Sequence, residues 1–393
     1  MDNKRKKRFL IIWLILCLDT LHFFAQEIKY GINNYITYQV GDIPLVISVP
    51  HGGALAPSSI PDRTCPNAVT VTDLNTQNIA KELSISIFNL TGCYPHIVYC
   101  NLKRSKLDCN RNVTDGTCEF PESMTAWQEY HGFLKEALLN ADNEHIYNTF
   151  LLDIHGHGKA NQRIELGYLL DEQDLENTDL VLNTSALINS SSIKNLAFQN
   201  KNNLKHADLI RGPLSFGTLL HDKGYPTVPS SQIPSPGGDN TYYNGGYITS
   251  NYTSYNQQIS ANGFQIELNY TGIRNNSENI KKFASDLAVV ILEYMHTHRD
   301  IAKKSCQPAS IVPSEFEISE IWYRPESHSI CFSGNEIYDL EYQIYHYDGK
   351  LISSGKTISA VIELSNEMRS GLYIMQLRQR DGMLIKAFKF VID

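Results

Sequence analysis

The chain has 393 residues, of which 42% are hydrophobic and 19% are charged, and its formal net charge is −8. These proportions are those of a globular protein with room for one large domain and one small domain. The net negative charge, with no basic run beyond the N-terminus, argues against electrostatic binding to nucleic acid, so no nucleic-acid partner is expected.

The N-terminus begins with a basic run and continues into a short apolar one. Residues 4–8 (KRKKR) are all basic, and residues 9–18 are apolar until Asp19 interrupts them. An apolar stretch of this length is too short for a membrane span, which needs about 20 residues, and it fits a signal peptide. We therefore predict a signal peptide over residues 1–26 and a secreted or cell-surface protein. An uncleaved anchor is the alternative, and it also sends the rest of the chain out of the cytoplasm.

Export would permit disulfide bonds among the cysteines that follow the signal peptide. Of the eight cysteines, Cys17 lies in the predicted signal peptide, and the others are Cys65, Cys93, Cys100, Cys109, Cys118, Cys306 and Cys331. An odd number leaves one thiol over, and the sequence does not define the pairing. None of them shows the C-x-x-C spacing of a zinc site.

Apolar strands alternate with amphipathic helices through the central part of the chain. Strands are expected at residues 43–49, 97–101, 150–154 and 264–268. Helices are expected after an N-cap at Asp73 or Asn75, around residues 127–138 and over residues 280–294. This alternation predicts an α/β domain over residues 27–305, in which helices flank a mostly parallel mixed sheet.

Two stretches interrupt this alternation. Residues 183–203 are rich in Asn and Ser and are expected to form a surface excursion. Residues 306–314 contain two prolines after the last helix and are predicted to be a linker.

Beyond the linker, apolar segments flank Asp348–Gly349 and Asp381–Gly382, which are tight hairpin signals. Residues 315–393 are therefore predicted to form a small all-β sandwich.

This C-terminal domain resembles the sorting domain of proteins exported by the Bacteroidetes type IX secretion system. The resemblance is carried by Tyr345 and residues 348–350 (DGK), by residues 371–373 (GLY) and by the basic and apolar tail at residues 386–392. It implies export through the secretion machinery and says nothing of chemistry. A carbohydrate-binding or structural β-module is the alternative, because a fold alone does not define a function.

Two histidines follow predicted strands at their carboxyl ends. His51 lies in residues 49–53 (VPHGG), and His155 lies in residues 152–158 (LDIHGHG). Ligands bind at this edge of open α/β sheets, so the two imidazoles are predicted to bind one metal ion. His157 is a second choice for this role, and Asp153 could orient a ligand. The alternative is that both segments are polar turns, whose glycines are needed for the backbone conformation and whose histidines have no role in binding.

Two further segments carry polar groups that could serve catalysis. Residues 103–112 (KRSKLDCNRN) contain Arg104, Asp108, Asn110 and Arg111, and an arginine fork suits a substrate carboxylate. A solvated surface loop with a salt bridge is the alternative. Residues 263–270 (GFQIELNY) place Glu267 within an apolar strand, where a carboxylate is costly unless it is paired or functional. Glu267 is predicted to be a general base, or else to point into solvent from an edge strand.

These groups, taken in chain order, resemble the zinc carboxypeptidase superfamily, in which a histidine, an arginine, an Asn-Arg pair, a second histidine and a glutamate follow one another. Residues 50–53 (PHGG), 107–111 (LDCNR), 153–155 (DIH) and 244–247 (NGGY) are more similar to the N-formylglutamate amidohydrolase family within it. The resemblance spans about residues 43–294. It implies a zinc-exopeptidase-like fold and a hydrolase that acts on C–N amide bonds.

One departure from the superfamily concerns the third metal ligand. Carboxypeptidases place a glutamate three residues after the first histidine, and Ala54 occupies that position here. Asp73, in residues 72–75 (TDLN), is proposed to replace it because it opens the helix that follows the His51 loop. Helix capping is the alternative role for Asp73.

The resemblance then implies a complete catalytic assignment. One Zn²⁺ ion is held by His51, Asp73 and His155. Glu267 acts as general base and Arg104 stabilises the developing oxyanion, while Asn110 and Arg111, with Asp108 beside them, bind a substrate carboxylate. The implied reaction is hydrolysis of N-formyl-L-glutamate to formate and glutamate.

Other functions remain open at this point. An exported relative could be a carboxypeptidase or a cell-wall amidase, and a non-catalytic surface binding protein could keep the same fold. A serine hydrolase is disfavoured because no G-x-S-x-G motif is present.

Overall fold

The computed structural model divides the chain into two compact units, Met1–Gln307 and Pro308–Asp393. In the first unit it describes residues 26–142, 149–238 and 242–299. In the second it describes residues 318–334, 340–346, 350–357, 361–365, 368–378 and 384–392. The predicted signal peptide, except Gln26, and the predicted linker lie outside the described residues.

The first unit is built on a mixed sheet of eight strands in the order β1-β2-β4-β3-β5-β8-β6-β7. The strands are β1 Ile28–Tyr30, β2 Ile36–Gln39, β3 Leu45–Val49, β4 His96–Cys100, β5 Phe150–His157, β6 Ile164–Gly167, β7 Thr227–Val228 and β8 Asn262–Asn269. Four neighbouring pairs are parallel, and β1·β2, β2·β4 and β6·β8 are antiparallel. The predicted α/β class and the mostly parallel mixed sheet are confirmed.

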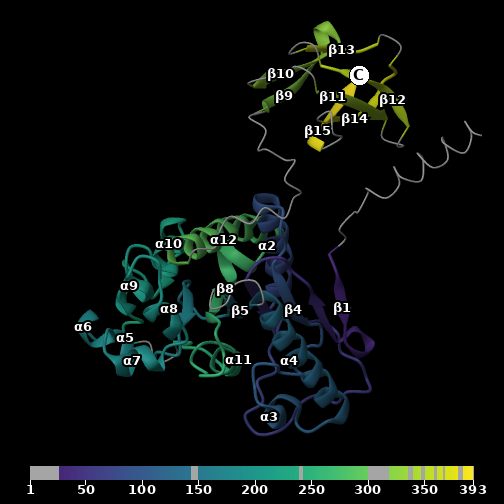
Figure 1. Cartoon of the computed structure of the whole chain (residues 1–393). Helices are drawn as coiled ribbons and strands as arrows, with labels where there is room; N and C mark the ends of the chain where they lie inside the picture. Colours follow the sequence, from purple (N-terminus) through teal and green to yellow (C-terminus); the bar gives the residue numbers. More distant parts are fainter. Residues whose placement is uncertain are drawn as a thin grey trace, which may run out of the picture. The chain divides into compact units, whose positions relative to one another are not determined.

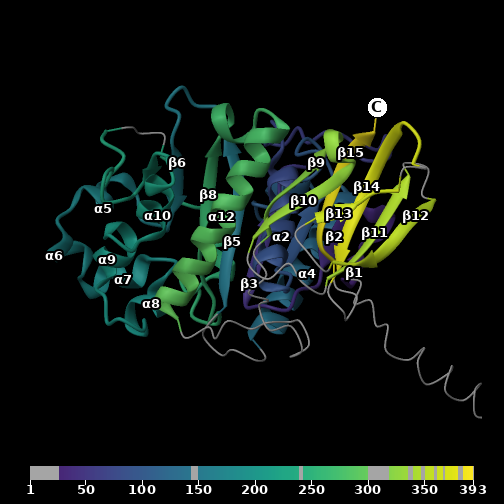
Figure 2. The same ribbon diagram turned by 90° about the horizontal axis from the view of Figure 1, so that it is seen from above.

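Helices cover both faces of this sheet (Figures 1 and 2). α2 (Thr76–Thr91) and α12 (Ser277–His298) pack together on one face, and α4 (Pro121–Asp142) covers the other. Alternation along the central strands divides the side chains between these layers. In β3, Leu45 and Ile47 join the core under α2 and α12, whereas Val46 joins the core under α4.

The start of α2 differs from the expectation that Asp73 or Asn75 caps it. Asn75 occupies the N-cap position in a left-handed conformation with φ of 67°, and its side chain makes no capping hydrogen bond. The Asp73 side chain does not cap the helix either, because its carboxylate points toward the histidines described below. In the last turns of α2, Ile87 is fully buried and Leu90 is 55% exposed.

Short helices fill the region between β6 and α11 (Tyr247–Tyr252) and lie beyond one end of the sheet (Figure 2). They are α5 Glu172–Glu176, α6 Asp179–Leu182, α7 Ser185–Ser190, α8 Lys194–Phe198, α9 His206–Arg211 and α10 Phe216–Asp222. The predicted surface excursion at residues 183–203 is therefore partly helical. Ile193 and Leu196 within it are buried in the main core, so the excursion also contributes to packing.

The second unit contains only antiparallel strand pairs among its described residues. β13-β10-β9 form one sheet and β12-β11-β14-β15 form another. The strands are β9 Ile318–Arg324, β10 Ser329–Gly334, β11 Glu341–His346, β12 Leu351–Lys356, β13 Val361–Glu363, β14 Gly371–Arg378 and β15 Leu384–Ile392. The pairs β11·β12 and β14·β15 confirm the two predicted hairpin pairings, although the turns at residues 347–349 and 379–383 lie outside the described residues.

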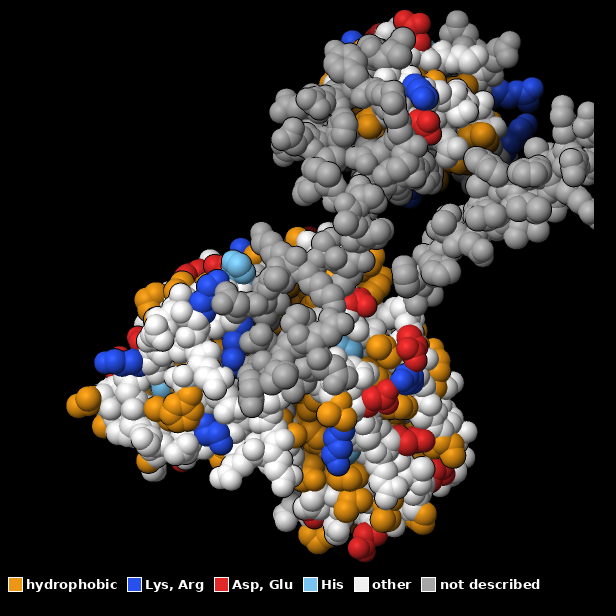
Figure 3. Space-filling model, viewed as in Figure 1, with side chains coloured by type: hydrophobic (Ala, Val, Ile, Leu, Met, Phe, Trp, Pro, Cys, Tyr) orange, Lys and Arg blue, Asp and Glu red, His pale blue; other side chains and the backbone are white. Residues whose placement is uncertain are grey.

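The described residues include both disulfide-bonded and free cysteines. Cys65 and Cys118 form a disulfide bond, Cys93 is disulfide-bonded as well, and three other cysteines are free and buried: Cys100, Cys109 and Cys331. On the face seen in Figure 3, Lys and Arg side chains lie among acidic and uncharged ones and do not merge into a continuous basic surface. Within the described residues, the longest helices are not apolar enough to cross a membrane.

Candidate metal centre

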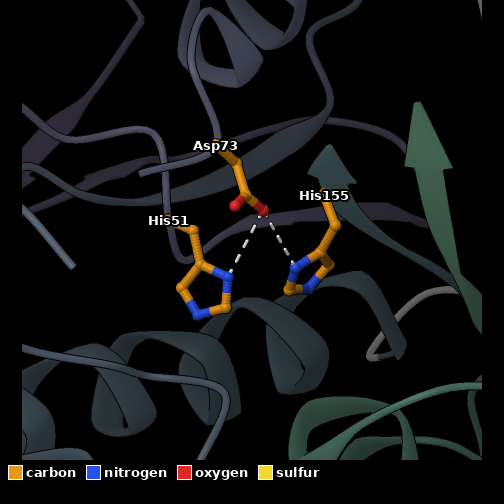
Figure 4. A group of neighbouring side chains, drawn as sticks. All are labelled: His51, Asp73 and His155. Carbon is orange, nitrogen blue, oxygen red and sulfur yellow. Dashed lines mark ion pairs between the residues drawn. The ribbon is translucent and has the colours of Figure 1, made fainter. Parts of the chain in front are cut away.

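Two histidines and one aspartate meet at the carboxyl edge of the parallel strands (Figure 4). His51 follows β3, His155 lies near the end of β5, and Asp73 lies in the loop before α2. The alternation of β5 sends Ile154 into the core under α2 and α12. Asp153 and His155 consequently point to the opposite face, where the site forms.

The Asp73 carboxylate lies between the two imidazoles. Its Oδ2 atom is 3.5 Å from Nδ1 of His51 and 3.5 Å from Nδ1 of His155. One potential ligand atom from each residue lies within 4.8 Å of the other two. All three side chains are buried.

The Asp108 carboxylate contacts the ring nitrogen of His51 that points away from Asp73. Nε2 of His51 is 2.7 Å from Oδ1 of Asp108, which is fully buried. Arg104 Nε donates to Oδ2 of Asp108 at 3.0 Å, and the main-chain N–H of Asn110 donates to Oδ1 at 3.0 Å. Asp108 was expected to bind substrate, but its oxygens accept from protein groups and are shielded from solvent. This arrangement corrects that expectation, because the Asp108 carboxylate is engaged by His51, Arg104 and the main chain of Asn110.

A second carboxylate holds His155 in the same way. Nε2 of His155 is 2.9 Å from Oδ2 of Asp153, and the hydroxyl of Ser48 donates to Oδ1 of Asp153 at 2.7 Å. The Ser48 hydroxyl is in turn 2.7 Å from the hydroxyl of Tyr130 on α4. Sequence reasoning missed Ser48 and Tyr130. The one available signal was Ser48 itself, a polar residue within an apolar strand.

The two carboxylates leave both Nδ1 atoms directed at Asp73. Carboxylate partners of this kind fix the tautomer and ring orientation of metal-binding histidines. Among the described residues, Nδ1 of His51 is buried and has no hydrogen-bond partner, which is costly for a polar atom. Two imidazole nitrogens and one carboxylate oxygen are a set of ligands found at catalytic zinc sites, so the residues fit one divalent ion.

The charges of the centre also favour a cation. Burial opposes ionisation of Asp73, but its contacts with His155 and His51 outweigh burial and hold the pKa of Asp73 well below its usual range. Burial likewise opposes ionisation of Asp108, but the charges of His51 and Arg104 keep its pKa well below the usual range. Ionised carboxylates thus lie in front of and behind the His51 ring, and a divalent ion bound to the neutral imidazoles would replace the ring protons as the positive charge beside them.

Glu267 lies beside this centre in an adjoining cavity of about 380 Å³. β8 is an interior strand between β5 and β6, and its register places Glu267 opposite His155. The edge-strand alternative for Glu267 is therefore wrong. Gln265 Nε2 donates to Oε1 of Glu267 at 2.9 Å. Burial raises the pKa of Glu267 to about 7, His155 opposes this rise, and Asp73 adds to it.

The residues that were expected to contact substrate also line or adjoin this cavity. Arg104 lines it while holding Asp108, with Nη1 3.5 Å from Oδ1 of Asp73. Asn110 lines it too, although its Oδ1 accepts from the main-chain N–H of Ile248 at 2.8 Å. Arg111 lines the cavity with an exposed side chain that makes no hydrogen bond or ion pair with any described residue. Its guanidinium is thus free to bind a ligand.

His157, the second choice for a metal ligand, has both ring nitrogens occupied. Its Nε2 is 2.8 Å from the main-chain oxygen of Arg163, and its Nδ1 accepts from the main-chain N–H of Lys159 at 3.2 Å. It is the last residue of β5, where it pairs with Asn269 of β8. The structure therefore excludes His157 from the group that His51, Asp73 and His155 form.

Fold and site together define an α/β protein with a buried candidate centre for one divalent metal ion. No protein-family model matches the sequence, and no curated protein matches it. An N-formylglutamate amidohydrolase from Ralstonia eutropha JMP134 is similar in structure, with a TM-score of 0.42 and 14% identity over 66% of this chain and 97% of that one. A metallo-carboxypeptidase from Pseudomonas aeruginosa, in complex with (2-guanidinoethylmercapto)succinic acid, has a TM-score of 0.31 and 10% identity over 68% of this chain and 64% of that one. Both TM-scores are below 0.5, so the case for a function rests on the geometry of the centre.

Proposed function

We propose that this chain is a metal-dependent hydrolase that cleaves the amide bond of a small substrate with a free carboxylate. One observation carries the proposal. Asp73 and His155, which form a group with His51, line the same cavity as a buried glutamate with a raised pKa and an exposed arginine. A metal site, a base and a carboxylate-binding group are what such a hydrolase needs.

The metal would be held by His51, Asp73 and His155 and would supply Lewis acidity toward the amide carbonyl together with a water of lowered pKa. Glu267 is placed to take a proton from the attacking water and to deliver it to the leaving nitrogen. Burial raises the pKa of Glu267 toward neutral pH, where a carboxyl group can both accept a proton and return it. Arg104, at the cavity wall, is placed to stabilise negative charge on the carbonyl oxygen.

Arg111 and Asn110 would hold the substrate carboxylate. The Arg111 fork can form two parallel hydrogen bonds with a carboxylate, which adds geometry as well as attraction. Asn110 Nδ2 lies 3.3 Å from Oε1 of Gln265, so the amide group already occupies the cavity wall. The resemblance in sequence names N-formyl-L-glutamate as the first substrate to test. A C-terminal peptide bond or a cell-wall amide of an acidic residue would present the same carboxylate.

We further propose that the enzyme acts outside the cytoplasm. The basic and apolar N-terminus supports a signal peptide, and the hairpins of the second unit fit a sorting domain for the secretion machinery. A disulfide bond between Cys65 and Cys118 suits an oxidising location. Fractionation of the native cells, with detection of the chain outside the cytoplasmic fraction, would test the location.

The test of the proposed chemistry is Glu267→Gln compared with wild type. Hydrolysis of N-formyl-L-glutamate or of a short acidic peptide should fall at least a hundredfold, in the range of general-base catalysis, while bound zinc stays near one per chain. Glu293→Gln, at an exposed position on α12, is the matched control and should leave both readings unchanged. A zinc-free wild-type protein that gains no activity on zinc addition would instead favour a non-catalytic binding protein.

A further inference from the structure

Arg274 is a buried arginine whose guanidinium group contacts main-chain carbonyls and, among the described residues, no carboxylate. It ends the turn η2 (Tyr270–Arg274) that follows β8. Nε donates to the carbonyl of Leu268 at 3.1 Å, and Nη2 donates to the carbonyl of His157 at 2.8 Å. Nη1 donates to the carbonyl of Leu74. One planar group therefore joins three separate segments of the chain.

These three segments are the ones that carry the candidate chemistry. Each carbonyl lies within two residues of a proposed metal ligand or of the proposed base: Leu74 follows Asp73, Leu268 follows Glu267, and His157 is two residues beyond His155. The guanidinium thus connects the loop before α2 with the ends of β5 and β8. A shift of any one segment would change the spacing of the metal ligands and the base.

Gly156 allows Arg274 to lie against β5. A Cβ atom added at Gly156 would lie 2.3 Å from Cζ of Arg274, a distance that no side chain could keep. The main-chain N–H of Gly156 also donates to Oδ2 of Asp73 at 3.1 Å. A Cβ atom added at Gly158, two residues further along, would meet nothing within 4 Å. The glycine between His155 and His157 is therefore explained by close packing against Arg274.

We propose that Arg274 is a positioning residue for the metal centre, which acts through the main chain of the Asp73 loop and of β5. The proposal rests on the metal-dependent function proposed above. Charge-assisted hydrogen bonds in a buried site are stronger than those between neutral groups, and three of them converge here in one plane. A lysine keeps the charge, but its single ammonium group on a flexible stem cannot reproduce this fork.

The first test compares Arg274→Lys with Arg211→Lys. Arg211 also bridges main-chain carbonyls, those of Leu175 and Asn177, but in the helical region away from the centre. Zinc affinity is measured by competition with a chromophoric chelator, beside the thermal midpoint of the metal-free protein. Arg274→Lys should weaken zinc binding at least tenfold, as does loss of groups that orient metal ligands. The zinc affinity of Arg211→Lys should stay within twofold of the wild-type affinity, even if its thermal midpoint falls as much as that of Arg274→Lys.

The second test uses the two glycines, so that the result does not depend on one variant folding well. Gly156→Ala should weaken zinc binding as Arg274→Lys does, because it displaces the guanidinium, whereas Gly158→Ala should bind zinc as wild type does. Wild-type affinity in Arg274→Lys, or an equal loss in Arg211→Lys, would overturn the inference. Zinc binding without hydrolysis in the wild-type protein would contradict the proposed reaction alone. A wild-type protein that binds no zinc would contradict both.

Discussion

Nε2 of His51 lies 2.7 Å from Oδ1 of Asp108, and both side chains are buried. This contact turns Nδ1 of His51 toward Asp73, so it decides which ring nitrogen is available to a metal ion. Asp108→Asn should therefore weaken zinc binding by about 10- to 100-fold, because the amide can present a donor where the ring N–H needs an acceptor.

Chelator competition measures this effect directly. Asp62→Asn is the control, because that carboxylate is 64% exposed and contacts Lys106. Equal zinc affinity in Asp108→Asn and wild type would show that Asp108 does not orient His51.

Arg111 is predicted to control substrate affinity and not the chemical step. Arg111→Met should raise KM for a carboxylate substrate at least tenfold, since hydrogen bonds to a charged group contribute about 1.5–3 kcal/mol. kcat should change less than threefold, because the carboxylate is bound equally in the ground state and the transition state. Initial-rate kinetics measure both constants.

Lys103→Met is the matched control for Arg111→Met, because Lys103 is an exposed cation of the same segment that does not line the cavity. A fall in kcat with unchanged KM would place Arg111 in the chemical step instead.

The buried side chain of His96 should make the folded protein less stable in acid. Its Nδ1 accepts from the main-chain N–H of Gly41 at 3.0 Å, so the buried ring is neutral. Burial lowers the pKa of His96 to about 4, against about 6.5 in the unfolded chain. The unfolded state therefore binds a proton that the folded state does not, and the free energy of unfolding should fall as pH decreases from about 6.5 to about 4.

Urea unfolding of metal-free protein at several pH values across this range measures the effect. His96→Asn keeps a hydrogen-bond acceptor but cannot titrate, so its free energy of unfolding should depend less on pH than that of wild type. The expected difference in slope, integrated over the range, is on the order of 3 kcal/mol. Parallel pH profiles for the two proteins would contradict this account.

The Cys65–Cys118 disulfide is predicted to support the wall of the cavity that carries Asn110 and Arg111. It joins residues 53 positions apart, one on each side of that wall in the sequence. Arg63 reinforces the same wall, because its Nη2 donates to the carbonyl of Asp115 at 2.9 Å and its Nη1 to that of Arg104 at 2.8 Å.

Replacing both Cys65 and Cys118 by serine should lower the free energy of unfolding by about 2–4 kcal/mol and raise KM. Zinc content should stay near that of wild type, since neither cysteine is near a proposed ligand in the described contacts. Loss of zinc in step with stability would indicate general unfolding and not a loosened wall.

Much of the fold could be predicted because it depends on local patterns. Continuous apolar strands and helices with periodic apolar faces predicted β3, β4, β5 and β8 and the helices α2, α4 and α12. The same patterns placed His51 and His155 at the carboxyl ends of strands. The structure brings these two side chains together with Asp73, Arg104, Asn110, Arg111 and Glu267.

The remaining features depend on contacts that no local pattern contains. Asp73 precedes a helix and could equally have capped it, and only the folded chain shows its carboxylate between two imidazoles. Tyr130 reaches Ser48 across 82 positions, and Arg274 reaches Leu74 across 200. Such partners are defined by packing of whole layers. The sequence therefore predicted the types of residue at the centre better than the roles of those that hold it in place.

The spread of the centre along the polypeptide has a consequence for the order of events during biosynthesis. His51 belongs to an early part of the nascent chain, while Arg274 is among the last residues of the first unit to leave the ribosome. A truncated product that stops before this arginine lacks the group that joins the ligand-bearing segments. Because metal capture and folding are coupled, loading of the ion should be a late step of maturation. The compartment where the first unit completes its folding would then determine which metal the chain receives.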